Sequence, residues 1–120
     1  MRNWFVAPTY KQAKNIAWNI LKEICYEYPQ LIHKKNESEL SIEFINGSLI
    51  ELKGCDNEDS LRGPGLDKIN PDEFAFVKDG KRLWGEVLRP MLTDRKGKAT
   101  FIGTPDGFNY MYDIYQKGRT

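Results

Sequence analysis

A short apolar run that leads directly into an amphipathic segment most constrains how this 120-residue chain can fold. The run, Trp4-Phe5-Val6-Ala7, is stopped by Pro8 and is typical of a buried strand. Thr9 then predicts the start of a helix, with Gln12 closing a capping box, and Pro29 predicts its end. Apolar residues at helical spacing predict one stripe that faces a core: Ala13, Ile16, Ala17, Ile20, Leu21 and Ile24. A strand followed at once by such a helix is the first half of a β-α-β unit.

A β-hairpin is predicted next, because Asn46-Gly47 lies between two apolar segments, residues 40–44 and 48–52. The pairs that this turn would bring together are Phe44 with Leu49 and Ile42 with Glu51. The second pair joins an apolar and a charged side chain, so the predicted register is imperfect.

The rest of the chain continues the alternation of strands and helices. Residues 54–65 are rich in Gly, Asp, Asn and Ser and indicate a loop. An imperfect strand follows this loop and ends before Asp72. A short helix that Asp79 could cap and Pro90 terminates is marked by Leu83, Trp84, Val87 and Leu88. Residues 98–102 predict another strand, and a last helix is expected over 110–117 with Gly118 as its stop.

This order of elements predicts a single α/β domain with a largely parallel sheet and helices on both of its faces. In such sheets the chemistry lies at the carboxyl ends of the strands, where loops meet the following helices. The net charge of +1 gives no general attraction to nucleic acid, so any contact with DNA would need a local patch.

Cysteine and hydropathy patterns exclude several other classes of protein. Cys25, Cys55 and His33 have no spacing that would form a zinc site, and we expect both thiols to be free in a reducing cytoplasm. No apolar run approaches the ~18 residues that span a bilayer, and no apolar stretch typical of a signal peptide follows Met1.

Three short segments could carry chemistry. Asp72-Glu73 follows a predicted strand, where one acid can hold the magnesium shell and the other can orient or deprotonate an attacking water. Arg62 lies in a glycine-flanked loop and can reach a phosphate, and Thr104 of Gly103-Thr104-Pro105 ends a strand and can bond water or a γ-phosphate. Taken singly, each segment is more typical of solvated surface charge or a plain turn than of a functional site.

The ordered set of these segments resembles the ATPase domain of the terminase large subunits of phages. Segments that match the family in order and spacing span residues 4–117. They are Trp4 to Ala13, Asp59-Ser60-Leu61-Arg62-Gly63, Asp72-Glu73-Phe74-Ala75, Trp84, Leu88-Arg89-Pro90 and Phe101-Ile102-Gly103-Thr104-Pro105-Asp106-Gly107. The resemblance implies a P-loop NTPase-like (ASCE-type) partial three-layer fold, with residues 1–120 as part of one ATPase domain and no nuclease domain.

The resemblance also implies a role for each matched residue. Asp72 matches the magnesium-associated acid of the Walker B motif, and Glu73 matches the catalytic glutamate. Gly103 and Thr104 fall in the coupling motif that links hydrolysis to movement, and Arg62 matches an arginine proposed to act on a neighbouring subunit's nucleotide.

Terminase large subunits use ATP and Mg²⁺ to drive viral DNA into capsids, and cut it with a separate C-terminal nuclease domain. The partners implied are double-stranded DNA, the capsid portal, the small terminase subunit and further copies of the large subunit. The resemblance places the protein in the cytoplasm of a bacterial host, encoded by a phage or prophage, with no membrane association.

Three features depart from the family pattern. The sequence contains no G-x-x-x-x-G-K-[ST] loop, so we expect no tight binding of ATP by this chain alone. Pro71 should end a central strand, and Asn70 would bring a polar amide into the core, so the strand is expected to be short or the acids displaced. The chain stops at Thr120, before any nuclease domain, which suggests a truncated gene product such as a prophage remnant, or a deliberately expressed piece.

These features lead to an expectation and two alternatives. We expect an ATPase fragment that is inactive by itself, and an open sheet edge that makes the chain dimerise or aggregate. One alternative is a non-catalytic interaction module or one half of a split ATPase. The other is a different P-loop helicase or packaging ATPase with the same Walker B and coupling arrangement.

Overall fold

The computed structural model describes residues 1–63 and 65–103. Its strands are β1 (Arg2–Ala7), β2 (Ile32–Asn36), β3 (Ser41–Phe44), β4 (Leu49–Gly54), β5 (Lys68–Pro71) and β6 (Lys98–Ala99). Its helical segments are α1 (Tyr10–Gln12), η1 (Ala13–Trp18), α2 (Asn19–Glu27), η2 (Pro29–Leu31), η3 (Glu58–Leu61), η4 (Phe74–Phe76), α3 (Gly80–Leu83), η5 (Trp84–Leu88) and α4 (Arg89–Thr93). The expected helix over residues 110–117 lies outside the described residues.

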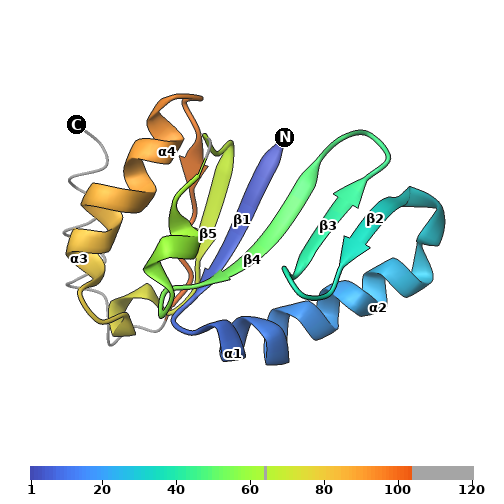
Figure 1. Ribbon diagram of the computed structural model, residues 1–120, viewed down its shortest axis with the longest axis horizontal. Helices are drawn as coiled ribbons and strands as arrows, with labels where there is room; N and C mark the ends of the chain where they lie inside the picture. The colour runs from blue at the N-terminus through green and yellow to red at the C-terminus, as the bar shows by residue number, and fades with distance from the viewer. Residues whose placement is uncertain (64, 104–120) are drawn as a thin grey trace.

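The strands form one six-stranded sheet in the order β2-β3-β4-β1-β5-β6 (Figure 1). β1 pairs in parallel with both β4 and β5, and β5 pairs in parallel with β6, whereas β2, β3 and β4 are antiparallel neighbours. The prediction of an α/β fold with a largely parallel sheet is therefore confirmed. The strand β2 was not predicted, and its lysines are typical of an edge strand protected from pairing.

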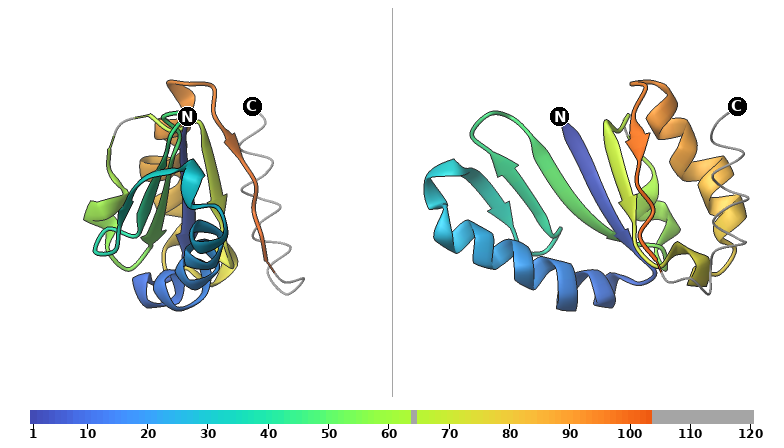
Figure 2. Two further views of the ribbon diagram at one scale, coloured as in Figure 1. Left: turned by 90° about the vertical axis from the view of Figure 1, so that its right-hand side faces the viewer. Right: turned by 180° about the vertical axis from the view of Figure 1, so that it is seen from behind.

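Two continuous helices cover different halves of the sheet on opposite faces. The N-terminal helix, residues 10–27, packs on the β3-β4 half through one core, and the second helix, residues 80–93, packs on the β1-β5 half through another (Figures 1 and 2). Alternation along β1 explains the division, because Trp4 and Val6 join the second helix's core while Ala7 joins the other. Cys25 and Cys55 are free thiols that belong to different cores, so the sheet separates them.

The N-terminal helix begins and ends as predicted. The Thr9 hydroxyl accepts a hydrogen bond from the Gln12 backbone N–H at 3.1 Å, and the same hydroxyl also contacts the Gln12 side chain. The helix ends at Glu27, with Tyr28 as the cap just before Pro29.

The predicted register of the hairpin is wrong by one residue. Ile42 pairs with Ile50, not with Glu51, because Phe44 bonds Ser48 across a three-residue loop that contains Gly47 at a φ of +89°. A type I turn followed by a left-handed residue gives this longer loop. The shift brings apolar side chains opposite one another on the face that is buried, which decides the register.

The second helix does not end at Pro90 as predicted. It continues to Thr93, with Pro90 in the first turn of α4 directly after the π-helical segment η5. A π-helical turn changes the backbone hydrogen bonds, so the missing N–H of a proline at this position is tolerated. Asp79 does occupy the position before the helix, but its carboxylate bonds Arg82 and caps no backbone N–H.

The predicted apolar stripe of the N-terminal helix is only partly buried. Ala13 is fully buried, whereas Ile16, Ile20 and Ile24 are 58%, 56% and 45% exposed. Trp18, at the margin of the stripe, is buried instead and donates its indole N–H to Glu37. The helix is therefore rotated about its axis relative to the prediction, and one apolar row faces away from its core.

The strand before the acids is short, as predicted from Pro71. β5 ends at Pro71. The Pro71 carbonyl accepts a hydrogen bond from the Ile102 N–H, so the backbone nitrogen of Pro71, which has no N–H to donate, also faces the side of β6, the outermost strand. The expectation that Asn70 enters the core is wrong, because Asn70 is half-buried on the opposite face from Ile69. β6 is shorter than the predicted strand over residues 98–102, although its pairing resumes at Ile102.

No helix within the described residues is long and apolar enough to cross a membrane.

Candidate functional site

Asp72 and Glu73 lie at the carboxyl edge of the parallel strands. Asp72 donates its backbone N–H to Val6 of β1 at 2.7 Å and forms a parallel bridge with Ile102. Glu73 donates its backbone N–H to the Ile102 carbonyl, also at 2.7 Å. The acid pair and the start of Gly103-Thr104-Pro105 are therefore neighbours at one edge. Thr104 lies outside the described residues.

Glu73 has a left-handed backbone, with φ of 50° and ψ of 40°. Such a conformation is unfavourable for a residue other than glycine and persists where the surroundings hold it. The fully buried Phe74 directly follows Glu73, and the backbone N–H of Glu73 is held by the Ile102 carbonyl. Strain of this kind occurs often at functional sites, because the side chain must be aimed in one direction.

Three aromatic rings pack together behind this edge. Phe74, Trp84 and Phe101 lie with ring centroids 4.9–6.4 Å apart and meet edge to face. Phe74 follows the acid pair, and Phe101 precedes Ile102 and Gly103, so one cluster anchors both segments to the second helix. Edge-to-face packing adds to the stability that burial gives these rings.

The acid pair suits a hydrated metal better than a cage of protein ligands. Partial burial raises the pKa of Asp72 above its usual range by desolvating the carboxylate, and a bound cation would counter that effect. The described residues contain no group of three or more His, Cys, Asp and Glu side chains placed to hold a metal. A cation at this edge would therefore have to take one or two carboxylates along with waters and phosphates, which is the kind of coordination that Mg²⁺ accepts.

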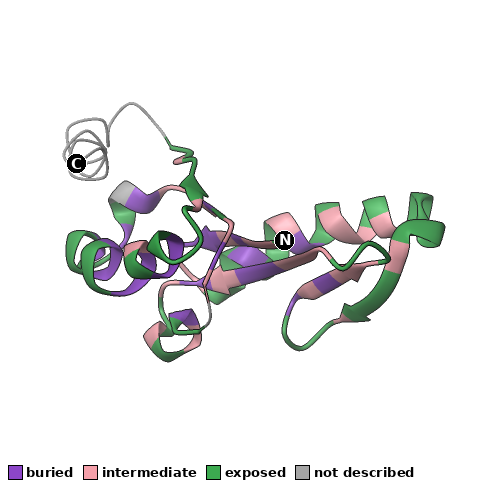
Figure 3. Ribbon diagram, turned by 90° about the horizontal axis from the view of Figure 1, so that it is seen from above, coloured by how far each residue is buried: buried purple, intermediate pink, exposed green. Residues whose placement is uncertain are grey.

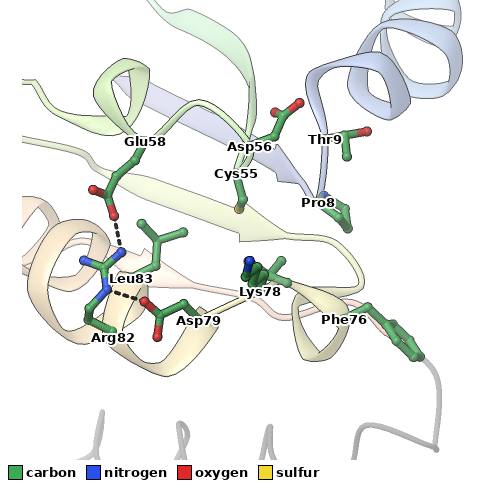
Figure 4. A pocket seen from close by; sticks show the side chains of 11 residues that line it. Pro8, Thr9, Cys55, Asp56, Glu58, Phe76, Lys78, Asp79, Arg82 and Leu83 are labelled. Atoms are coloured by element: carbon green, nitrogen blue, oxygen red, sulfur yellow. Dashed lines mark hydrogen bonds and ion pairs between the residues drawn. The ribbon is translucent and has the colours of Figure 1, made fainter.

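Arg62 is not brought into contact with the acids. It follows η3, its side chain is 60% exposed, and its ion pair within the described residues is a long one of 3.7 Å to Glu58. Glu58 is bound more closely by Arg82, which also donates to Asp79 (Figure 4). Asp72, Glu73 and Gly103 therefore lie at one edge of the sheet, and Arg62 does not join them.

A hollow of about 560 Å³ lies beside the ion pairs of Arg82 and does not include Asp72 or Glu73. It is open between the ends of β1 and β4 and the start of the second helix, and Figure 4 shows the side chains that line it: Pro8, Thr9, Cys55, Asp56, Glu58, Phe76, Val77, Lys78, Asp79, Arg82 and Leu83. Burial and the nearby Asp56 raise the pKa of Cys55 to about 12, so this thiol is protonated at neutral pH.

Sequence reasoning missed the charged network in this hollow. The signal was present, because Asp79, Arg82 and Glu86 stand at helical spacing and all three interact. The link to Glu58 in η3 could not be found from spacing, because 24 residues separate it from Arg82.

The fold matches solved terminase structures. The large terminase ATPase domain of Thermus phage P74-26 aligns with a TM-score of 0.70 at 27% identity, over 87% of this chain and 47% of that one. The large terminase of another thermophilic bacteriophage aligns with a TM-score of 0.71 at 15% identity, over 98% of this chain and 31% of that one, which supports the fold alone. This second terminase has also been solved in complex with ADP; the complex aligns with a TM-score of 0.54 at 14% identity, over 85% of this chain and 25% of that one.

A largely parallel sheet with helices on both faces, together with the match to terminase ATPase domains, defines an α/β protein with a P-loop NTPase-like fold. The sequence matches the family described as terminase large subunit, T4likevirus-type, N-terminal, over residues 2–119, and the chain belongs to this family. The terminase large subunit of Escherichia phage T5 is 35% identical over 113 residues, or 94% of this chain and 26% of the relative. That of Thermus phage G20c is 25% identical over 139 residues, or 98% of this chain and 27% of the relative. The chain spans about a quarter of the length of these relatives.

Proposed function

We propose that this chain supplies the hydrolytic acids of a DNA-packaging terminase ATPase, and that the phosphate-binding loop comes from a different segment. The observation that carries the proposal is the parallel pairing of Asp72 with Ile102, which joins the acid pair to the Gly103 segment at one sheet edge. Family membership and the ADP complex of the second thermophilic-phage terminase support a nucleotide as the ligand.

Each residue that matches the family pattern has a separate role in the proposal. Asp72 holds the water shell of Mg²⁺, and Glu73 accepts a proton from the attacking water. Bound MgATP supplies the phosphate and the cation that neutralises its charge. Gly103 and Thr104 contact the γ-phosphate side and link hydrolysis to movement of the strand end. Arg62, exposed and loosely paired, acts on a nucleotide held by a neighbouring copy.

The wider role follows from the family and is proposed with it. The protein takes part in moving double-stranded viral DNA into capsids within the bacterial cytoplasm, together with the portal, the small terminase subunit and copies of the large subunit. By itself we expect no hydrolysis, because the sequence has no G-x-x-x-x-G-K-[ST] loop.

One half of a split ATPase is the second candidate function, and the outer edge of β6 favours it. Lys98, Thr100 and Ile102 donate their backbone N–H groups to the β5 side, so the intervening groups of Ala99 and Phe101 point outwards. An edge of this kind, unpaired within residues 1–63 and 65–103, can accept a strand from another chain, or from a second copy of this one.

Nucleotide binding by calorimetry with Mg²⁺ tests the proposal. We expect no tight binding of ATP by the chain alone. Once a P-loop-bearing segment is added, we expect weak binding of ATP, and Asp72→Ala should remove it. Glu73→Ala should leave binding in place, because its role is in hydrolysis. Tight binding of ATP by the isolated chain would contradict the proposal.

A further inference from the structure

Two arginines share the carboxylate of Glu58. The Nη2 of Arg82 donates a hydrogen bond to the Oε1 of Glu58, whereas the Nη2 of Arg62 lies 3.7 Å from the Oε2. The second distance is too long for a hydrogen bond and leaves only an ion pair. Glu58 begins η3 and Arg62 directly follows it, so the two residues are one turn apart. The same carboxylate therefore binds Arg82 closely and Arg62 weakly.

Acids of its own helix and the residue before it hold Arg82 in place. The Nε of Arg82 donates to Asp79 at 2.5 Å, and its Nη1 lies 3.4 Å from the carboxylate of Glu86. Hydrogen bonds to Asp79 and Glu58 raise the pKa of Arg82, because both acids favour its charged form. Figure 3 shows green, exposed residues on the outer side of the second helix, and Arg82 and Glu86 are among the exposed residues. All three guanidinium nitrogens of Arg82 thus face acids, which fixes its contact with Glu58.

Glu58 stands where Arg62 would otherwise bind a phosphate. A guanidinium group binds carboxylates and phosphates through the same N–H groups, so Arg62 has to leave Glu58 before it can bind a nucleotide. An exposed ion pair at this distance is weak, and the exchange costs little. If Arg82 did not bind Glu58, both carboxylate oxygens would be available to Arg62 in a stronger two-point contact.

We propose that Glu58 is a positioning residue that keeps Arg62 on its own subunit, and that Arg82 keeps this contact weak enough for the nucleotide of a neighbouring copy to break it. The inference rests on the proposed function, in which Arg62 acts on that nucleotide. Arg82 belongs to the second helix, which follows the acid pair along the chain. A shift of this helix would change how much of the Glu58 carboxylate is left for Arg62, so the network links the acid pair to the arginine.

Two variants of the whole chain are expected to change the mobility of Arg62 in opposite directions. Glu58→Gln removes the charge that holds Arg62, so its guanidinium should move more freely. Arg82→Gln leaves Glu58 to Arg62 alone, so the same guanidinium should move less. The heteronuclear NOE at the Nε of Arg62, measured by NMR, should fall in the first variant and rise in the second. The double variant should match Glu58→Gln, because Arg82 acts only through that carboxylate.

Asp59→Asn is the matched control. It removes the same charge from the same turn, and the Asp59 side chain has no ion pair or hydrogen bond within residues 1–63 and 65–103. The NOE at Arg62 should stay at its wild-type value in this variant. Circular dichroism should show that all variants are folded.

Phosphate release from mixtures with a P-loop-bearing terminase segment gives the second measurement. At saturating ATP, Arg82→Gln should slow release by about two- to fivefold, the range that an exposed ion pair can supply. Glu58→Gln should raise the rate by up to about twofold, because the contact that it removes is already weak. A structural role alone would slow both variants, so the opposite signs identify a positioning role.

Three outcomes would overturn the proposal. They are NOE changes of the same sign in Glu58→Gln and Arg82→Gln, a double variant that behaves like Arg82→Gln, and a change in Asp59→Asn as large as that in Glu58→Gln. Equal slowing of phosphate release by Glu58→Gln and Arg82→Gln would also contradict it. Opposite NOE changes with no phosphate release from any mixture would leave the contacts of Arg62 standing while the proposed function fails.

Discussion

The two long helices each carry an apolar stripe of six residues but differ in how far the structure buries it. In the second helix Leu83, Trp84, Val87, Leu88, Met91 and Leu92 are all buried. In the N-terminal helix three of the six predicted stripe residues are about half exposed. An amphipathic pattern states that a face must be covered, and it does not state which segment covers it. Within the described residues, the sheet and its neighbouring segments cover the apolar face of the second helix. They cover only part of the apolar face of the N-terminal helix.

The largest test of this contrast is truncation of one stripe residue in each helix. Leu88→Ala should lower the free energy of unfolding by about 2–5 kcal/mol, because Leu88 is fully buried in a packed core. Ile20→Ala should change it by less than about 0.5 kcal/mol, as at other surface positions. Chemical denaturation of both variants measures the difference. Equal losses would show that the exposed row is already packed.

Relief of backbone strain should give the next largest effect. Glu73→Gly should raise the free energy of unfolding by about 1 kcal/mol, since glycine adopts a φ of 50° without steric cost. Glu73→Ala is the control, because it removes the carboxylate but keeps the strain. A stabilised alanine variant would mean that charge, not backbone strain, is the cause.

The pH dependence of Asp72 should give a smaller effect. Its pKa is raised in the folded state, so the ionised carboxylate costs stability above that pKa and costs nothing below the unfolded value of 3.8. Asp72→Asn should therefore stabilise the chain at pH 7 and lose this advantage as the pH falls below about 4. Thermal melts at both pH values measure the difference, and a pH-independent gain would rule out desolvation as the cause.

The smallest effect is expected when the exposed row is made polar. Ile16→Gln with Ile24→Gln should leave the free energy of unfolding within about 0.5 kcal/mol of wild type and should reduce aggregation. Light scattering and denaturation together check this. A large loss of stability would show that the row contributes to the fold of the chain alone.

Much of the fold followed from the sequence because its signals are local. The run ended by Pro8, the Thr9 cap and the effect of Pro71 on β5 each depend on neighbouring residues, and the structure confirms them. The register of the hairpin, the continuation through Pro90 and the rotation of the N-terminal helix depend on what packs across the sheet. Spacing along the chain does not contain that information.

The candidate site shows the same division. The placement of Asp72 beside Ile102 follows from parallel strands, because the carboxyl ends of such strands lie at one edge of the sheet. The position of Arg62 depends on Glu58, whose carboxylate Arg82 also binds in a network that links η3 to α3. The roles of Asp72, Glu73, Thr104 and Arg62 in hydrolysis remain predictions.

ATP hydrolysis by the chain mixed with a P-loop-bearing terminase segment tests the central claim most directly. We predict magnesium-dependent phosphate release only from the mixture, and its loss in Glu73→Gln with the complex still formed. Equal phosphate release from the wild-type and Glu73→Gln mixtures would contradict the account.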